Sequence, residues 1–214
     1  RACKGSPKDI FDELQTIVKK HHIDASTLSD ESRKKLLVDN NLGVDCSALA
    51  YHALDAESRG RGQGHLNRHL TFMTGRNPMT KMLSYLRPVE NCNVKTFASD
   101  TNSRVIALKE VRPGDFITML GGPDNVDRDH ILLIHEAEYA GESPVSIHYS
   151  HAVAYPKDGL YGTGLKRGKI DIANPEQGLT KQIWTEDGSA QKAEGILKRA
   201  HDSKTELRRL KWLS

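Results

Sequence analysis

The sequence predicts an α+β fold in which helices come first and an antiparallel sheet follows. Up to residue 54, apolar residues recur at the three- and four-residue spacing of amphipathic helices. From residue 104 onward, short apolar runs are bounded by turn residues, which is the pattern of strands. Helices and strands that are segregated along a chain are typical of the α+β class, because α/β folds need them to alternate.

Composition narrows the possible functions. A chain of 214 residues suits one domain of ordinary size, and 37% hydrophobic with 28% charged residues describe a globular protein with a modest core. Only 6% of the residues are aromatic, which argues against a stacking platform for single-stranded nucleic acid. The net charge of +3 is too weak to require a nucleic-acid partner, although it suits an anionic polymer. No stretch approaches the apolar length of a membrane span.

Three helices are expected before residue 60. Ser6 and Pro7 are a capping residue and a first-turn proline, and they predict a helix that continues to about residue 22. Ser29 is expected to cap a second, short helix, which segment 40–43 ends.

The third helix carries the first candidate functional residue. Asp45 is the expected N-cap, so Cys46 falls in the first helical turn. The apolar face of this helix is expected from four positions: Ala48, Leu49, Ala53 and Leu54. Unpaired N–H groups and the positive end of the helix dipole favour a thiolate at Cys46, and a thiolate is a nucleophile. The alternative is that Cys46 is a small buried hydrophobe.

The middle of the chain is less regular, and strands follow it. Residues 59–64 predict a loop, and residues 65–100 mix helix and loop signals, with Pro78 and Pro88 interpreted as breaks. A helix is expected over 190–201. The expected strands are 105–108, 116–120, 130–139, 144–151, 168–172 and 207–213.

Histidines on one expected hairpin are candidate partners of the cysteine. A turn at 141–143 places His130 opposite residues 152–154, with His151 as its nearest neighbour and His148 on the other face. A catalytic cysteine needs an imidazole to accept its proton and a third polar group to orient that imidazole. If the helix start packs against this end of the sheet, Cys46, His130 and His151 form a triad, with His148 as the alternative third residue.

Four segments, in this order, resemble the NlpC-type family of papain-like cysteine peptidases, which cleave bacterial cell-wall peptides. Residues 43–49 read Gly-Val-Asp-Cys-Ser-Ala-Leu, where the family has G-x-D-C-S-G-hydrophobic. Residues 111–117 read Val-Arg-Pro-Gly-Asp-Phe-Ile, similar to its R-P-G-D-L segment. Residues 129–133 (Asp-His-Ile-Leu-Leu) and 149–152 (Tyr-Ser-His-Ala) resemble its H-V-G-hydrophobic and hydrophobic-H-A segments. The resemblance covers about residues 36–172.

The resemblance implies a papain-like fold and hydrolysis of an amide or isopeptide bond in peptidoglycan stem peptides, with no metal and no cofactor. Cys46 would attack the carbonyl, His130 would act as base and then as acid, and His151 would orient His130. The oxyanion would be bound by the backbone N–H of Cys46 and a neighbouring donor, with Asp45 and Ser47 in supporting roles. The family implies a location outside the cytoplasm: secreted, periplasmic or attached to the wall.

The resemblance also implies a domain organisation. Residues 1–35 would be a helical extension and residues 36–214 the catalytic domain. Residues 59–104 would be an insertion that could roof the cleft or bind another protein. Two features depart from the family: Ala48 stands where it has glycine, and segment 38–42 replaces its Tyr-x-x-Gly-Gly segment, which helps to shape the substrate cleft.

Other functions are compatible with the same residues. A zinc hydrolase would draw its ligands from six histidines: His65, His69, His130, His135, His148 and His151. The first two have helical i, i+4 spacing but lack the Glu that follows the first histidine in zinc proteases. A papain-like module without activity could bind wall peptides or a partner protein, and an acyltransferase could use the same thioester intermediate.

The remaining cysteines and the tryptophans have structural interpretations. Cys3 and Cys92 either form a disulfide, which leaves Cys46 free, or are reduced thiols. Trp184 and Trp212 are expected in the core.

Overall fold

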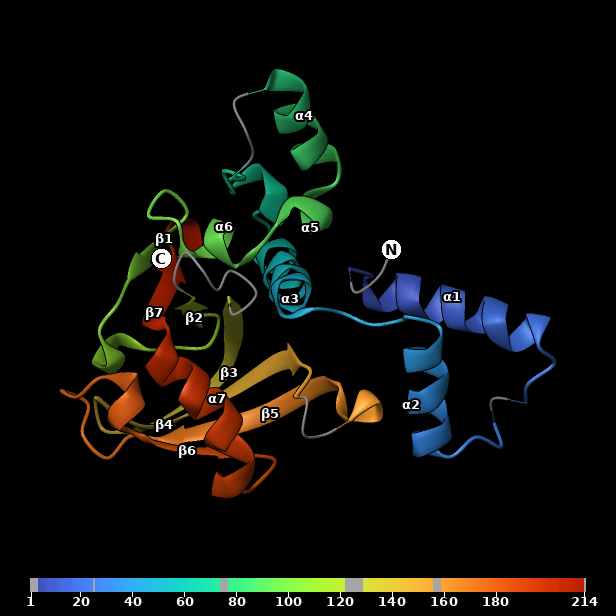
Figure 1. Cartoon of the computed structure of the whole chain (residues 1–214). Coiled ribbons are helices and arrows are strands. Elements are labelled where there is room, and N and C mark those ends of the chain that lie inside the picture. Colours follow the sequence, from blue (N-terminus) through green and yellow to red (C-terminus); the bar gives the residue numbers. More distant parts are fainter. Residues whose placement is uncertain (1–3, 25, 74–76, 122–128, 156–158, 214) are drawn as a thin grey trace.

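One antiparallel sheet with helices on both faces forms the centre of the computed structural model, which describes residues 4–24, 26–73, 77–121, 129–155 and 159–213 (Figure 1). Within this part of the chain the sheet has seven strands in the order β1-β7-β2-β3-β4-β5-β6. The predicted α+β class is therefore confirmed.

The helices and strands have the following bounds. The strands are β1 (Ser103–Val105), β2 (Phe116–Leu120), β3 (His130–Ala140), β4 (Ser143–Val153), β5 (Gly164–Asp171), β6 (Ile183–Glu186) and β7 (Lys204–Leu210). The α-helices are α1 (Pro7–Lys20), α2 (Asp30–Asp39), α3 (Cys46–Gly60), α4 (Pro78–Leu86), α5 (Pro88–Asn91), α6 (Val94–Ala98) and α7 (Ala190–Asp202). The 3-10 helices are η1 (Leu66–Arg68), η2 (Leu108–Glu110), η5 (Leu160–Gly162), η6 (Leu179–Lys181) and η7 (Lys211–Leu213).

The three N-terminal helices begin where the capping residues predict. The side chains of Ser6, Ser29 and Asp45 each accept a backbone N–H of the following turn, which satisfies a donor that has no partner inside the helix. Helices α1 and α2 lie to one side of α3 (Figure 1). The domain boundary expected after residue 35 falls inside α2, which is a continuous helix.

The two faces of the sheet carry separate hydrophobic clusters, because successive strand residues point to opposite faces. On one face, strand residues such as Met119 and Leu132 pack with Ile196 of α7. On the other face, Ile131 packs with Leu54 of α3. Helices α3 and α7 therefore cover opposite faces of the sheet, and this decides how the candidate residues meet.

The sequence-based boundaries are confirmed in part. Pro78 and Pro88 are each the first residue of a helix, where a missing N–H costs no hydrogen bond, and Pro88 separates α4 from α5. The strand expected over 105–108 pairs only at 103–105, after which the chain turns into η2. Strand β6 was not predicted.

The cysteine and tryptophan expectations have mixed outcomes. Cys92 is a buried free thiol, and Cys3 lies outside the described residues. Trp184 is buried in the cluster beneath α7, as predicted, whereas Trp212 is only partly buried and stacks on His69 with ring centroids 4.5 Å apart. Among the helices of the described residues, none has the length and apolar character needed to span a membrane.

Candidate functional site

Cys46 is the first residue of α3, and its side chain is half-buried. The Asp45 side chain caps the helix, and its Oδ1 accepts the N–H of Ala48 at 2.7 Å. Cys46 packs against the hydrophobic cluster that contains Ile131, the second residue of β3. The start of α3 therefore lies against the start of β3.

A lysine that the sequence analysis did not single out fixes this first helical turn. Lys4 Nζ lies 2.9 Å from Asp45 Oδ2 and donates to Ser47 Oγ at 2.7 Å. Ser47 Oγ in turn donates to Asp45 Oδ1 at 2.9 Å. These contacts of Asp45 and Ser47 hold the turn that presents Cys46. No local pattern points to Lys4, because its partners lie about forty residues further along the chain.

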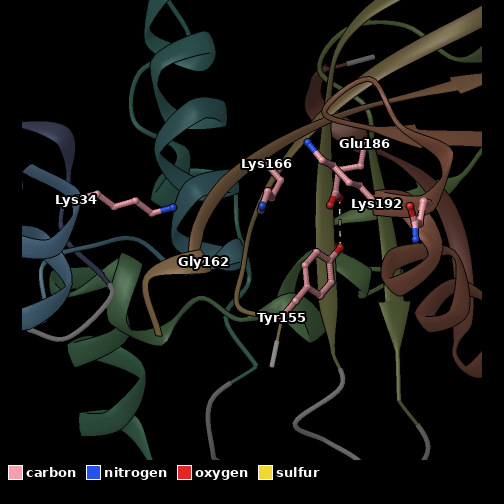
Figure 2. A pocket seen from close by; sticks show the side chains of 7 residues that line it. Lys34, Tyr155, Gly162, Lys166, Glu186 and Lys192 are labelled. Carbon is pink, nitrogen blue, oxygen red and sulfur yellow. Dashed lines mark hydrogen bonds between the residues drawn. The ribbon is translucent and has the colours of Figure 1, made fainter. Parts of the chain in front are cut away.

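Three buried side chains from three strands form one hydrogen-bonded chain. His130 Nε2 lies 2.7 Å from His151 Nδ1, and His151 Nε2 lies 2.8 Å from Glu186 Oε1. The hydroxyl of Tyr155 donates to the same carboxylate oxygen at 3.2 Å (Figure 2). His130, His151 and Glu186 are at most 2% exposed. The pairing of Leu133 with Ser150 brings the residues before Leu133 close to those after Ser150, which explains how His130 meets His151.

His148 lies on the other face of the hairpin and does not contact His130. Its Nε2 is 3.5 Å from Glu138 Oε1, and its ring centroid is 6.3 Å from that of His135. The structure therefore brings His151, and not His148, to His130. Within the described residues, no three His, Cys, Asp or Glu side chains are grouped as metal ligands.

The other two histidines considered as zinc ligands, His65 and His69, also have other hydrogen-bond partners. His65 Nδ1 lies 3.3 Å from Asp55 Oδ1, and His69 Nε2 lies 2.9 Å from the carbonyl oxygen of Gln63. Of the six histidines, His130 therefore lies with His151 and His135 near His148, while His65 and His69 each have other partners.

The Cys46 thiol and the His130 imidazole lie on opposite sides of the sheet at the start of β3, and they are not in contact. His130 pairs in register with Met119, which belongs to the face that α7 covers. Cys46 packs into the cluster on the α3 face. No hydrogen bond joins Cys46 to His130 in the described part of the chain. The peptide between His130 and Ile131 separates the two side chains.

Burial keeps both groups neutral. It raises the pKa of the Cys46 thiol, with a smaller contribution from Asp45 in the same direction, and outweighs the hydrogen bond from Ile131. The expectation that the helix start favours a thiolate is therefore wrong, because loss of water counts for more than the helix dipole at this depth. Burial, followed by the nearby His151 and Arg199, holds the pKa of His130 well below its usual range.

Of the residues in this hydrogen-bonded network, the sequence analysis missed Glu186 and Tyr155. Glu186 ends β6, and the only local signal is a short Ile-Trp-Thr-Glu run before an Asp-Gly turn. Both residues also line a cavity of about 380 Å³ between α2, β5 and α7. A second cavity, of about 840 Å³, lies between α1 and segment 40–43. Neither of these two cavities is lined by Cys46.

Comparison with known proteins gives no relative. No family model, no curated protein and no solved structure matches this chain.

Proposed function

We propose that the protein is a cysteine hydrolase with a papain-like fold that cleaves an amide or isopeptide bond in peptidoglycan stem peptides, as the NlpC-type family does. The supporting observation is the buried hydrogen-bonded chain from Glu186 to His130, the residue before Ile131, together with the packing of Cys46 in the same cluster as Ile131. The substrate class and the reaction class come from the sequence resemblance, and the hydrogen-bonded chain supports the role of His130 as a base.

The hydrogen-bond chain selects the tautomer that a general base needs. The Glu186 carboxylate can only accept, so His151 Nε2 carries a proton and donates it. His151 Nδ1 is then an acceptor, and it receives the Nε2 proton of His130. Consequently His130 Nδ1 carries no proton and has a lone pair for the thiol. His151 is a positioning residue in this scheme, and Glu186 extends its role by one more partner.

The chemistry follows from a neutral thiol and a neutral base. His130 Nδ1 takes the thiol proton as the sulfur attacks the carbonyl carbon, and backbone N–H groups at the start of α3 stabilise the oxyanion. The C–N bond then breaks, and His130 returns the proton to the leaving amine. Water hydrolyses the thioester, which yields a carboxylate and regenerates the thiol. This step requires the start of α3 and the start of β3 to move relative to each other when substrate binds, because Cys46 and His130 face opposite sides of the sheet and rotation of the thiol alone does not bring them together.

The test compares two cysteines with different surroundings. Purified wall fragments are digested with the wild type, with Cys46→Ser and with Cys92→Ala, and the new termini are identified by mass spectrometry. We expect Cys46→Ser to lower the cleavage rate at least about a thousandfold, because a serine hydroxyl is a far weaker nucleophile in a thiol site. Cys92→Ala is the matched control, since this free thiol is buried away from His130, and it should release the same products as the wild type. Equal rates for wild type and Cys46→Ser would contradict the proposal.

A further inference from the structure

Three lysines from three different elements converge on the cavity of about 380 Å³. Lys34 comes from α2, Lys166 from β5 and Lys192 from α7. Figure 2 shows Lys34 reaching in from the α2 side, opposite Lys166, with Glu186 and Tyr155 beyond. Among the described residues that line the cavity, Glu186 is the only carboxylate.

Two of the three lysines have no ion pair with a described carboxylate. In the part of the chain that the structure describes, neither Lys34 nor Lys192 has a carboxylate within ion-pair distance, whereas Lys166 Nζ lies 3.7 Å from Asp187 Oδ2. The Glu186 carboxylate accepts hydrogen bonds from His151 and Tyr155 instead. Like charges that share a partly enclosed space repel one another more strongly than they would in bulk water.

The start of α7 adds to this positive field. Lys192 lies in the first turn of this 13-residue helix, which has no acidic residue there, and the N-cap Ser189 makes no side-chain hydrogen bond. The first turn of a helix presents N–H groups without partners and the positive end of the dipole, so a lysine is unfavourable there and an anion is favourable.

We infer that this cavity binds a small ligand through an oxyanion group, such as a phosphate or a dicarboxylate. Negative charge on the ligand would match Lys34 and Lys192, and the cavity volume falls within the usual range for small-molecule sites, about 300–1,000 Å³. The inference does not rest on the proposed hydrolase function, because none of the three lysines belongs to the catalytic group.

The test measures anion binding to the whole chain by NMR. Inorganic phosphate and glutarate are titrated in separate experiments at constant pH and ionic strength, and the amide signals of Gly162 and Gln191 report on the cavity. We expect saturable shifts with at least one of the two anions. Lys34→Gln and Lys192→Gln should each weaken binding by about fivefold or more, as loss of a charge-assisted contact does.

A matched control and a neutral ligand make the test decisive. Lys198→Gln changes a lysine of the same helix that is exposed and paired with Asp202, and it should leave the dissociation constant unchanged. Saturation by phosphate alone would identify the ligand group as a phosphate, and saturation by glutarate alone would identify it as a dicarboxylate. Linear shifts with both anions, equal binding of the neutral glutaramide, or affinities unaffected by Lys34→Gln and Lys192→Gln would overturn the inference.

Discussion

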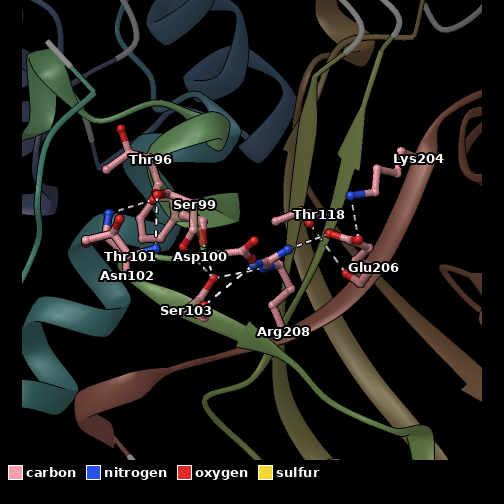
Figure 3. A network of polar contacts seen from close by, with 11 residues as sticks. Thr96, Ser99, Asp100, Thr101, Asn102, Ser103, Thr118, Lys204, Glu206 and Arg208 are labelled. Carbon is pink, nitrogen blue, oxygen red and sulfur yellow. Dashed lines mark hydrogen bonds and ion pairs between the residues drawn. The ribbon is translucent and has the colours of Figure 1, made fainter.

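Two of the buried polar networks in the part of the chain that the structure describes differ in their central group, which is an arginine in one and a histidine in the other. Around β7, the Arg208 guanidinium donates from Nε to Ser103 Oγ at 2.8 Å, from Nη1 to Glu206 at 2.5 Å and from Nη2 to Asp100 (Figure 3). Around β4, His151 joins His130 to Glu186. Arg208 and His151 are both at most 2% exposed.

The difference lies in what each network can do with a proton. A guanidinium stays charged throughout the physiological range and has carboxylate partners, so the Arg208 network can only hold β7 to the segment before β1. A neutral imidazole has one ring nitrogen that donates and one that accepts, so this network can orient and pass on a proton, and it ends at the cavity that Glu186 lines. Burial alone therefore does not identify a functional site; a buried group that can change its protonation state is the better indicator.

The largest expected effect is on the stability that Arg208 supplies. Arg208→Ala should lower the free energy of unfolding by about 3 kcal/mol, because Glu206 and Ser103 lose the partner that compensates their burial. Urea denaturation measures this loss. Lys204→Ala is the control: it removes the exposed ion pair of Glu206 and should cost less than about 1 kcal/mol. A stable Arg208→Ala protein with lost cleavage activity would contradict the division between the networks.

The contrast between these networks also shows what sequence can predict. Helix caps and the hairpin of β3 and β4 follow from residues close together in the chain, so the positions of Cys46, His130 and His151 were predictable. The hydrogen bonds of Arg208 and Glu186 were not, because their partners come from strands distant in sequence. Nor could local periodicity show that α3 covers the face of the sheet opposite to His130, since that depends on how the elements pack.

The second largest expected effect is on the cleavage rate, and it distinguishes a role of Glu186 in orienting His151 from a role in stability alone. Glu186→Gln keeps a group of the same shape but adds a donor, which competes for the tautomer that leaves His130 Nδ1 unprotonated. We expect the cleavage rate to fall about 10- to 100-fold while the free energy of unfolding changes by about 1 kcal/mol or less. Histidine ¹⁵N shifts should report a tautomer change at His151. Glu138→Gln, beside His148 on the other face, should change neither.

A third prediction concerns the pH dependence of stability. The pKa of His130 is lower in the folded protein than in the unfolded chain, so the unfolded state binds the proton first as the pH falls. The stability that His130 contributes is thus complete above pH 6.5 and is lost below it, by up to about 1.4 kcal/mol of unfolding free energy per pH unit. Denaturation at pH 7.5, 6.5 and 5.5 measures this slope. His130→Gln should reduce it and Arg208→Met should not; equal slopes in all three proteins would show that His130 does not titrate on unfolding.

The smallest effect tests whether the networks are independent. Tyr155→Phe removes one hydrogen bond to Glu186 Oε1 and should lower the free energy of unfolding by about 1 kcal/mol. Combined with Arg208→Ala, its effect should add to within about 0.5 kcal/mol, because the two networks share no residue. Combined with Glu186→Gln, the effects should depart from additivity by more than about 0.5 kcal/mol, because both variants alter the same contact. The reverse pattern would mean that the sheet couples the two networks, so that Arg208 acts on the site as well as on the fold.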